Sequence, residues 1–239
     1  MIVCIDSGNS RIKWGIHDGA RWLAQGAVAH ADVAGLSGLP VEWPRPERVM
    51  LANVAGMVAG QRIRQQLASW QPLIVEAGAR YRQCGITNLY DIPERLGVDR
   101  WCALVGAWRI RHLPTVVIMA GTATTIDTLD GNGYFTGGQI LPGMGMMLDS
   151  LATGTAALPY AEGQYLACPR ATADAIVTGV IDAQIGAIER AYSRLDRPEA
   201  SCLISGGYAE RLATHLALPH CVAQNLPLEG LLHMALNPE

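Results

Sequence analysis

One pattern occurs twice in this sequence: a short apolar strand, a polar turn that contains glycine, and a second strand. The first copy opens the chain, where the apolar residues 1–5 lead into the turn 6–10 and then the strand 11–16. In that strand apolar and basic residues alternate, which places Ile12, Trp14 and Ile16 on one face. The pattern predicts a β-hairpin with a glycine turn at the very start of the fold.

The second copy lies near the middle of the chain. The β-branched run 115–119 has the composition of a strand buried on both faces, and it breaks at Gly121 into small hydroxylated residues before a strand resumes and ends at Asp127. Glycine permits close approach of a ligand, and threonine hydroxyls can donate to anionic oxygens. A phosphate cradle and an ordinary Gly/Thr-rich hairpin are equally compatible with this stretch alone.

The repetition favours the phosphate interpretation, because two such hairpins facing one cleft could hold a polyphosphate from both sides. Strands alternate with helical patterns in both halves, and no linker rich in Pro, Gly or Ser divides them. We therefore expect an α/β protein of duplicated topology with two packed lobes, residues 1–113 and 114–239, and a nucleotide cleft between the lobes.

Charge and composition limit the kinds of molecule that this protein is expected to bind. The 239 residues are 50% hydrophobic and 16% charged, with a formal charge of -3 and no basic block, which argues against nucleic acid and anionic membranes as partners. Lys13 is the only lysine and lies in the first hairpin. It is equally well explained as a phosphate contact or as the one lysine of an arginine-biased composition.

The six cysteines are scattered without a CxxC pair, and the apolar start is interrupted by Asp6, so no signal peptide or membrane span is expected. Reduced thiols and a cytoplasmic location fit this pattern best.

Periodicity places the remaining elements. We expect strand and turn over 20–47, then a strand at 48–54, a helix at 61–70, a strand at 73–75 and a helix from Asp99 that ends before Pro114. In the second half we expect a helix from 143 that ends within 153–159, helical segments at 170–176 and 180–195, a strand at 202–205, a helix at 208–216 and a terminal helix from 224.

Asp99 has two readings. As the first residue of a helix it is most simply an N-cap, and from its position alone this is the better explanation. The strand 202–205 followed by Gly206–Gly207 and a helix is either a nucleotide-binding turn or a plain βα turn.

Five short motifs, in this order, resemble those of the type III pantothenate kinases, in the superfamily of acetate and sugar kinases, Hsp70 and actin. They are Asp6–Ser10 (a first phosphate motif), Gly97–Arg100 (G-x-D-R, a substrate motif), Gly121–Asp127 (a second phosphate motif), Gly137–Gly143 (GG-x-I-x-PG) and Ser205–Gly207 (an adenosine motif). The likeness spans nearly the whole chain.

The resemblance implies two ribonuclease H-like lobes, a homodimer, and transfer of phosphate from ATP, with Mg²⁺, to the primary hydroxyl of pantothenate. Asp99 would be the general base and Asp6 the magnesium ligand. The residues implied to hold ATP are Asp6, Ser7, Gly8, Asn9, Ser10, Arg11, Ile12, Lys13 and Thr122. Those implied to contact pantothenate are Tyr90, Gly97, Val98, Asp99, Arg100 and, from the partner subunit, Thr172.

Two positions depart from the family pattern. Met119 stands where the family carries an aspartate that binds K⁺ or NH₄⁺, and a thioether cannot replace a carboxylate for that ion. Ala171 replaces an asparagine before Thr172. The competing hypotheses are another small-molecule kinase of the same superfold, and a non-catalytic accessory or regulatory protein that retains the nucleotide fold.

Overall fold

The computed structural model describes residues 1–156, 158 and 160–238 and divides them into two compact units. One consists of Met1–His112 together with Asn225–Glu239, and the other of Leu113–Gln224. Compared with the expected lobes, 1–113 and 114–239, Leu113 belongs with the second unit and the last helix belongs with the first.

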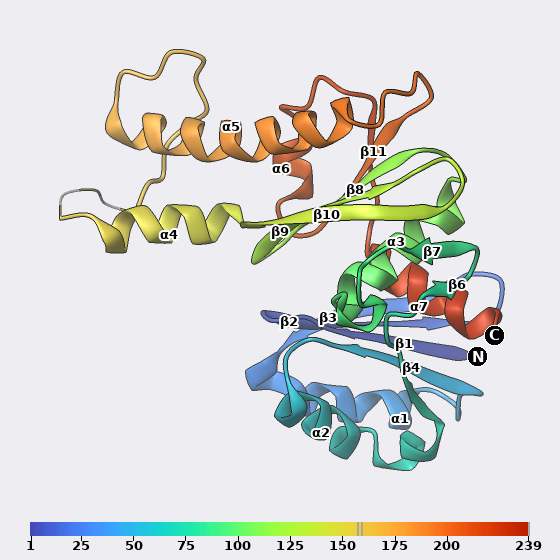
Figure 1. Ribbon diagram of the computed structural model, residues 1–239. Helices are drawn as coiled ribbons and strands as arrows, with labels where there is room; N and C mark the ends of the chain where they lie inside the picture. The colour runs from blue at the N-terminus through green and yellow to red at the C-terminus, as the bar shows by residue number, and fades with distance from the viewer. Residues whose placement is uncertain (157, 159, 239) are drawn as a thin grey trace. The chain divides into compact units, whose positions relative to one another are not determined.

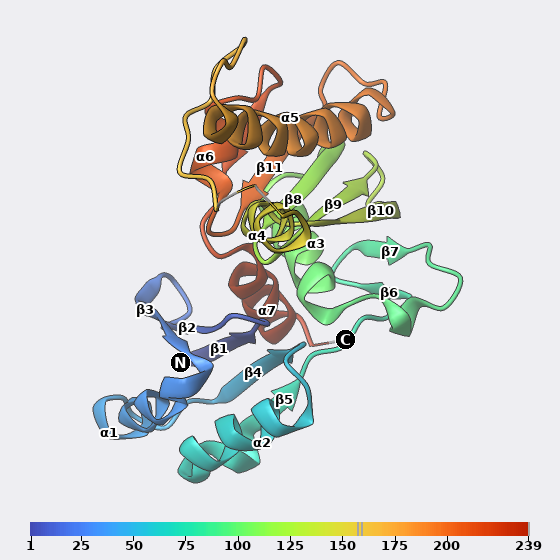
Figure 2. The same ribbon diagram turned by 90° about the vertical axis from the view of Figure 1, so that its left-hand side faces the viewer.

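The elements of the first unit are β1 (Ile2–Ser7), β2 (Arg11–His17), β3 (Trp22–Ala29), the 3₁₀ helix η1 (His30–Gly38), α1 (Leu39–Glu42), β4 (Arg48–Asn53), α2 (Met57–Gln66), the 3₁₀ helix η2 (Ala68–Leu73), β5 (Ile74–Glu76), β6 (Arg82–Gln83), β7 (Ile86–Asn88), the 3₁₀ turn η3 (Pro93–Arg95), α3 (Val98–Ile110) and α7 (Leu226–Leu236). Helices α1 and α2 lie on one side of its sheet and α3 and α7 on the other (Figures 1 and 2).

The elements of the second unit are β8 (Thr115–Ala120), β9 (Ala123–Leu129), β10 (Tyr134–Pro142), α4 (Met144–Gly154), α5 (Thr172–Ser193), β11 (Ser201–Ser205), α6 (Ala209–Ala213) and β12 (His220–Val222). Helix α5 packs on β8 and β9, as Figure 1 shows. Among the described residues, no helix is both long and apolar enough to cross a membrane.

The two units share one strand topology. In the first the strand order is β3-β2-β1-β4-β5, and in the second the corresponding order is β10-β9-β8-β11-β12. The central strand of each unit pairs antiparallel with the next strand in the chain and parallel with the strand on its other side. The expected duplication is confirmed, and it makes β1 the counterpart of β8.

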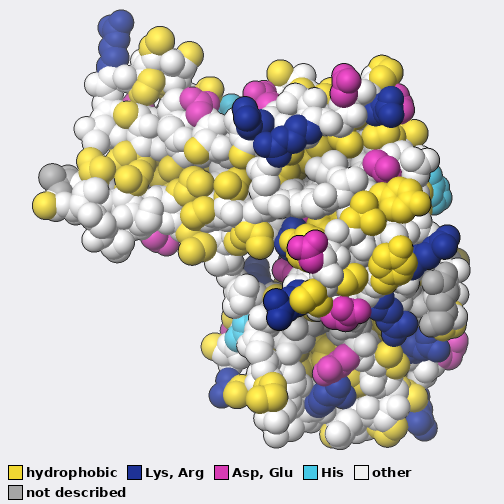
Figure 3. All heavy atoms as spheres, in the orientation of Figure 1, with side chains coloured by type: hydrophobic (Ala, Val, Ile, Leu, Met, Phe, Trp, Pro, Cys, Tyr) yellow, Lys and Arg dark blue, Asp and Glu magenta, His cyan; other side chains and the backbone are white. Residues whose placement is uncertain are grey.

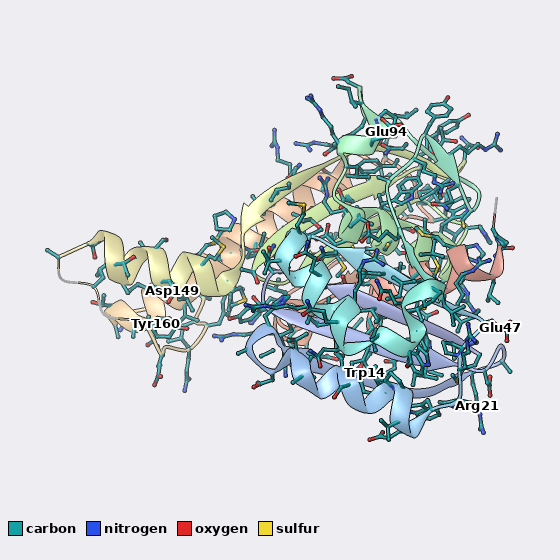
Figure 4. The ribbon with its side chains drawn as sticks, turned by 90° about the horizontal axis from the view of Figure 1, so that it is seen from below. Trp14, Arg21, Glu47, Glu94, Asp149 and Tyr160 are labelled. Atoms are coloured by element: carbon teal, nitrogen blue, oxygen red, sulfur yellow. The ribbon has the colours of Figure 1, made fainter. Side chains whose placement is uncertain are left out.

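Each sheet buries the face that its sequence pattern predicts. Ile12 and Ile16 on β2 are fully buried against α2 and η1, and Trp14, labelled in Figure 4, packs half-buried on the same cluster. In the second unit Ile118 and Ile126 are buried with Ile185 of α5. The glycine turn of each hairpin follows directly on a buried strand, β1 or β8, so the packing of these strands fixes where the two turns lie.

Helix α7 joins the first unit through a glycine contact with α3. A Cβ atom on Gly230 would lie 1.8 Å from the carbonyl oxygen of Cys102, and one on Gly106 would lie 2.4 Å from that of Leu226. Only hydrogen at both positions lets the two backbones approach this closely. Glu229 adds a polar link, accepting a 2.6 Å hydrogen bond from the indole N–H of Trp22.

Several boundaries differ from expectation. The helix expected at 61–70 is α2 at Met57–Gln66, followed by η2; it starts earlier because Gly56, at φ 88°, ends the preceding turn. The segments 170–176 and 180–195 form one helix, α5, which continues through Gly179. Residues 30–38, expected as strand and turn, are 3₁₀ helix. Of the stretch 153–159, residues 157 and 159 lie outside the described part.

Candidate active site

The first hairpin turns over Gly8, Asn9 and Ser10 between β1 and β2. The N–H of Gly8 donates a 3.1 Å hydrogen bond to the carbonyl oxygen of Arg11, which closes the turn. Asn9, Ser10 and Arg11 are exposed, whereas Ile12 is buried in the core. The turn therefore offers polar groups to solvent from a rigid base, to which the buried side chain of Ile12 belongs.

Asp6 is the buried acid of this hairpin. Its side chain is only 7% exposed, and within the described residues its Oδ1 has no hydrogen-bond partner. Burial raises the pKa of Asp6 to about 6, while Lys13 opposes this shift and Asp99 reinforces it. The neighbouring Ser7 hydroxyl is buried and likewise lacks a partner among the described residues. Unpartnered buried groups of this kind mark a place where a ligand can bind.

The substrate motif forms the start of α3. The helix begins at Val98 with Gly97 as N-cap, so the N-cap hypothesis for Asp99 is wrong. The Asp99 carboxylate still accepts a 2.9 Å hydrogen bond from the N–H of Arg100. A Cβ on Gly97 would lie 2.8 Å from Asp99 Oδ1, so glycine leaves the room that this carboxylate occupies. Asp99 itself is half-buried.

Tyr90 and Arg100 are in direct contact. Arg100 is 6% exposed, its Nη1 donates a 2.9 Å hydrogen bond to the Tyr90 hydroxyl, and its guanidinium carbon lies 5.7 Å from the centre of the Tyr90 ring. Asn88, which the sequence did not single out, orients this loop: its Oδ1 accepts the N–H of Tyr90 and its Nδ2 donates to the Pro93 carbonyl oxygen. Tyr90 and Arg100, two of the predicted substrate contacts, are thus brought together.

The second hairpin repeats the construction of the first. The N–H of Gly121 donates a 3.1 Å hydrogen bond to the carbonyl oxygen of Ala123, as Gly8 does to Arg11. Thr122 is exposed at the turn. Its carbonyl oxygen accepts a 3.0 Å hydrogen bond from the N–H of Gly143, so the turn is tied to the Pro142–Gly143 peptide at the end of β10.

The GG-x-I-x-PG element therefore acts as a support under the second hairpin. A Cβ on Gly143 would lie 2.2 Å from the carbonyl oxygen of Gly121 and 2.5 Å from that of Thr122, which explains the glycine. From α5, the buried Gln184 donates a 2.8 Å hydrogen bond to the Pro142 carbonyl oxygen. Sequence reasoning missed Gln184, whose only signal was one polar residue among the apolar positions of a helix.

The adenosine motif packs on the end of β8. Gly206 has φ 112°, and a Cβ there would lie 2.4 Å from the carbonyl oxygen of Ala120. The same oxygen accepts the N–H of Tyr208 at 3.1 Å. The hydroxyl of Ser205 is buried and has no partner among the described residues. The motif is thus a βα turn pressed against the second hairpin.

Met119 is the positional counterpart of Asp6, one residue before the end of its central strand. It pairs with Thr125 on β9 and Ser205 on β11, whose hydroxyls are buried and lack partners in the described chain. Two neutral hydroxyls and a thioether do not provide the carboxylate that the family's monovalent cation requires. These residues do not fit such an ion.

Thr172 is the exposed first residue of α5. Its helix has Ala171 as N-cap, with no side-chain hydrogen bond to the first turn. An asparagine at this position would supply such a bond, so Ala171 leaves one stabilising interaction unmade.

The donors for Mg²⁺ are few. Within the described residues, no group of three or more His, Cys, Asp or Glu side chains is arranged to hold a metal ion. A single buried carboxylate, Asp6, still fits Mg²⁺, because this ion keeps several waters and usually takes one or two protein carboxylates alongside substrate phosphates.

Asp6, Lys13 and Asp99 interact electrostatically in the first unit, whereas Thr122 and Thr172 belong to the second. Duplicated sheets, glycine hairpins at equivalent strand ends and a buried acid beside the first hairpin define the superfamily of acetate and sugar kinases, Hsp70 and actin. Residues 2–194 match the family model for type III pantothenate kinase. The chain belongs to the type III pantothenate kinase family.

Relatives agree with this assignment, and a solved structure shares the fold. The chain is 68% identical over 236 residues to a type III pantothenate kinase of Dechloromonas aromatica, with 99% of each chain covered. It is 46% identical over 234 residues to one of Aromatoleum aromaticum, covering 97% of this chain and 96% of the relative. MreB5 of Spiroplasma citri bound to ADP shares the fold at 9% identity, with a TM-score of 0.53 over 100% of this chain and 98% of that one.

Proposed function

We propose that this protein transfers the terminal phosphate of ATP to the primary hydroxyl of pantothenate, giving 4'-phosphopantothenate in the first step towards coenzyme A. Membership of the pantothenate kinase family supports the substrate. The observation that carries the mechanism is that Asp6 pairs with Lys13 across the first hairpin and lies near enough to Asp99 for that charge to raise its pKa, since the candidate base is then close to the hairpin.

Asp99 is the proposed general base. It accepts the proton of the pantothenate hydroxyl late in the transfer, and groups in this role contribute about 10²- to 10⁴-fold to the rate. Arg100 and Tyr90, fixed to one another at 2.9 Å, position the acceptor, with Gly97 and Val98 supplying backbone beside it. A guanidinium held in place suits the carboxylate of pantothenate, which it can bind through two hydrogen bonds.

Residues Asp6 to Lys13 and Thr122 are the proposed ATP contacts. Phosphoryl transfer passes through a loose transition state, so placing the phosphates and neutralising their charge are the main contributions. Backbone N–H groups and the hydroxyls of Ser10 and Thr122 donate to phosphate oxygens, and Lys13 adds a positive charge. Asp6 would hold Mg²⁺ through its water shell, and the bound ion would neutralise charge on the phosphates.

The monovalent cation is a separate question. Because Met119, Thr125 and Ser205 offer no carboxylate, we assign no K⁺ or NH₄⁺ to this place and no step of the reaction depends on one.

We further propose that the protein acts as a cytoplasmic homodimer without nucleic-acid or membrane partners. Thr172 would then reach the pantothenate of the partner subunit. Exposed apolar side chains of the second unit support self-association: Ile140 is 63% exposed, Met146 47% and Tyr160 52%. Figure 3 shows hydrophobic side chains gathered over α4 and α5, and Figure 4 labels Tyr160.

The test is ADP release by the purified protein with ATP and Mg²⁺, with and without pantothenate, together with mass detection of the phosphorylated product. Parallel reactions replace pantothenate with sugars and small hydroxy acids. We expect ADP only with pantothenate. ADP release with another acceptor alone would establish a different kinase of this superfold, and nucleotide binding without any turnover would establish an accessory protein.

A further inference from the structure

Both backbone polar groups of Gly8, in the turn of the first hairpin, make hydrogen bonds. Its N–H donates to Arg11, and its carbonyl oxygen lies 2.7 Å from Nε2 of His30. A carbonyl oxygen can only accept, so the His30 ring donates through Nε2–H in this contact. No motif described above includes His30, which comes from outside the hairpin.

The sheet fixes where His30 lies. Strand β3 pairs with β2 so that Ala29 is opposite Arg11, the first residue after the turn. His30 follows Ala29 directly and begins η1, where its side chain is half-buried. The register of β2 with β3 therefore delivers the imidazole to the turn, and the contact is part of the sheet's construction rather than a chance surface encounter.

A cavity lies beside His30 and the first turn. A cavity of about 300 Å³ adjoins the contact, lined by Asn9, His30, Val33, Ala55, Val58, Ala59 and Arg62. The hydrogen bond from His30 is a directional restraint on the Gly8 carbonyl at the edge of this space.

The orientation of the Gly8 carbonyl also sets the orientation of the next backbone donor, the N–H of Asn9. In a trans peptide the C=O of one residue and the N–H of the next point in opposite directions. With the Gly8 carbonyl turned to His30, the N–H of Asn9 points away from η1. Backbone N–H groups of this turn are the proposed phosphate donors, and a donor oriented in advance costs less free energy to use.

We propose that His30 is a positioning residue for ATP: it holds the first hairpin in the conformation whose Asn9 N–H can donate to a phosphate. The proposal rests on the proposed function of this hairpin. It assigns His30 to nucleotide binding and to no step in which pantothenate is recognised.

The test compares three variants of the full protein. His30→Phe keeps an aromatic ring and removes the donor, whereas His30→Gln restores an N–H at a similar reach. His220→Ala is the matched control, because His220, the first residue of β12 in the other unit, makes a 2.9 Å contact through Nδ1 with the Leu218 carbonyl oxygen. Calorimetric Kd values for ADP with Mg²⁺ are measured first, since they need no turnover.

We expect His30→Phe to weaken ADP binding and raise the KM for ATP by about tenfold, the effect of losing one hydrogen bond worth about 1.4 kcal/mol. The KM for pantothenate stays unchanged, His30→Gln recovers most of the loss, and His220→Ala behaves as the wild type. His30→Ala replaces His30→Phe if the larger ring prevents folding, as judged by circular dichroism and the thermal midpoint.

Unchanged ADP affinity in His30→Phe would overturn the proposal. So would equal losses in His30→Phe and His30→Gln, which would indicate packing, or an equal rise in the KM for pantothenate. A wild-type protein that binds ADP but does not phosphorylate pantothenate would refute the proposed function, while the ADP affinities would still decide the role of His30.

Discussion

Asp6 and Lys13 face each other across the β1–β2 pair, immediately below the first glycine turn. At the equivalent place of the second unit, Met119 faces Thr125 across β8–β9. The two hairpins thus share their topology and their closing hydrogen bond but not their charges. The first hairpin carries a carboxylate and an ammonium group beside its turn, whereas the second has a thioether and a hydroxyl at the equivalent place.

Asp99→Asn should lower kcat by about 10²- to 10⁴-fold with little change in the KM for ATP, because the amide cannot accept the hydroxyl proton. Asp91→Asn, which changes an exposed acid in the segment before α3, is the control and should leave turnover unchanged. Initial rates of ADP release measure both. Wild-type turnover in Asp99→Asn would remove this carboxylate from the mechanism.

Asp6→Asn should stabilise the protein at pH 7.5 while abolishing activity. Burial raises the pKa of Asp6 from 3.8 to about 6, so the folded state binds the proton more tightly than the unfolded chain does. The free energy of unfolding therefore decreases as pH rises through this range, by on the order of 2–3 kcal/mol. The asparagine variant avoids this loss.

Thermal midpoints of wild type and Asp6→Asn, measured at pH 4 and 7.5, check the sign: the two proteins should converge at the lower pH. Asp18→Asn is an opposite control, because backbone hydrogen bonds from Arg21 and Ala20 lower the pKa of Asp18. Its loss should destabilise the protein at pH 7.5. A less stable Asp6→Asn at pH 7.5 would contradict the account.

Activity should be the same in KCl and in tetramethylammonium chloride, because Met119 offers no carboxylate to a monovalent cation. Met119→Asp should create a dependence on K⁺, since it buries a charge beside two neutral hydroxyls. Its thermal midpoint should rise with added KCl, whereas that of Met146→Asp, on the exposed surface of α4, should not. Loss of wild-type activity on removing K⁺ would refute this prediction.

Gly143→Ala should destabilise the second hairpin by about 1–3 kcal/mol, as expected when a tightly packed site is overfilled. The added methyl group meets the carbonyl oxygens of Gly121 and Thr122, so the KM for ATP should rise as well. In α5, Gly179→Ala meets no atom within 4 Å and should instead stabilise the helix by about 1 kcal/mol. Thermal midpoints and ATP titrations of both variants test the contrast.

Much of the fold was predictable because its signals are local. The alternation in residues 11–16 and the apolar run 115–119 define the two hairpins, and their repetition predicts the duplicated topology that the strand orders confirm. Helix boundaries were less accurate. The start of α2 depends on the positive φ of Gly56, and the continuity of α5 through Gly179 depends on packing that periodicity does not encode.

The residues of the candidate site likewise fall into a group that the sequence could predict and a group that it could not. Motif residues such as Asp6 and Gly97 could be named from sequence, and their roles remain predictions. The side chains that contact the motif backbone could not: Asn88, His30 and Gln184 make hydrogen bonds to backbone groups outside their own helix or strand. Such contacts leave no spacing pattern. The N-cap reading of Asp99 failed because the preceding Gly97 takes that position.

The return of α7 to the first unit has a consequence for biosynthesis. The second unit is one uninterrupted stretch, Leu113–Gln224, whereas the first lacks the partner of α3 until Asn225–Glu239 emerges from the ribosome. Since nascent domains fold once their chain is available, the half translated earliest should mature last. Until then the glycine surface of α3 stays uncovered, so folding of the first unit waits for a segment that is translated after the whole second unit.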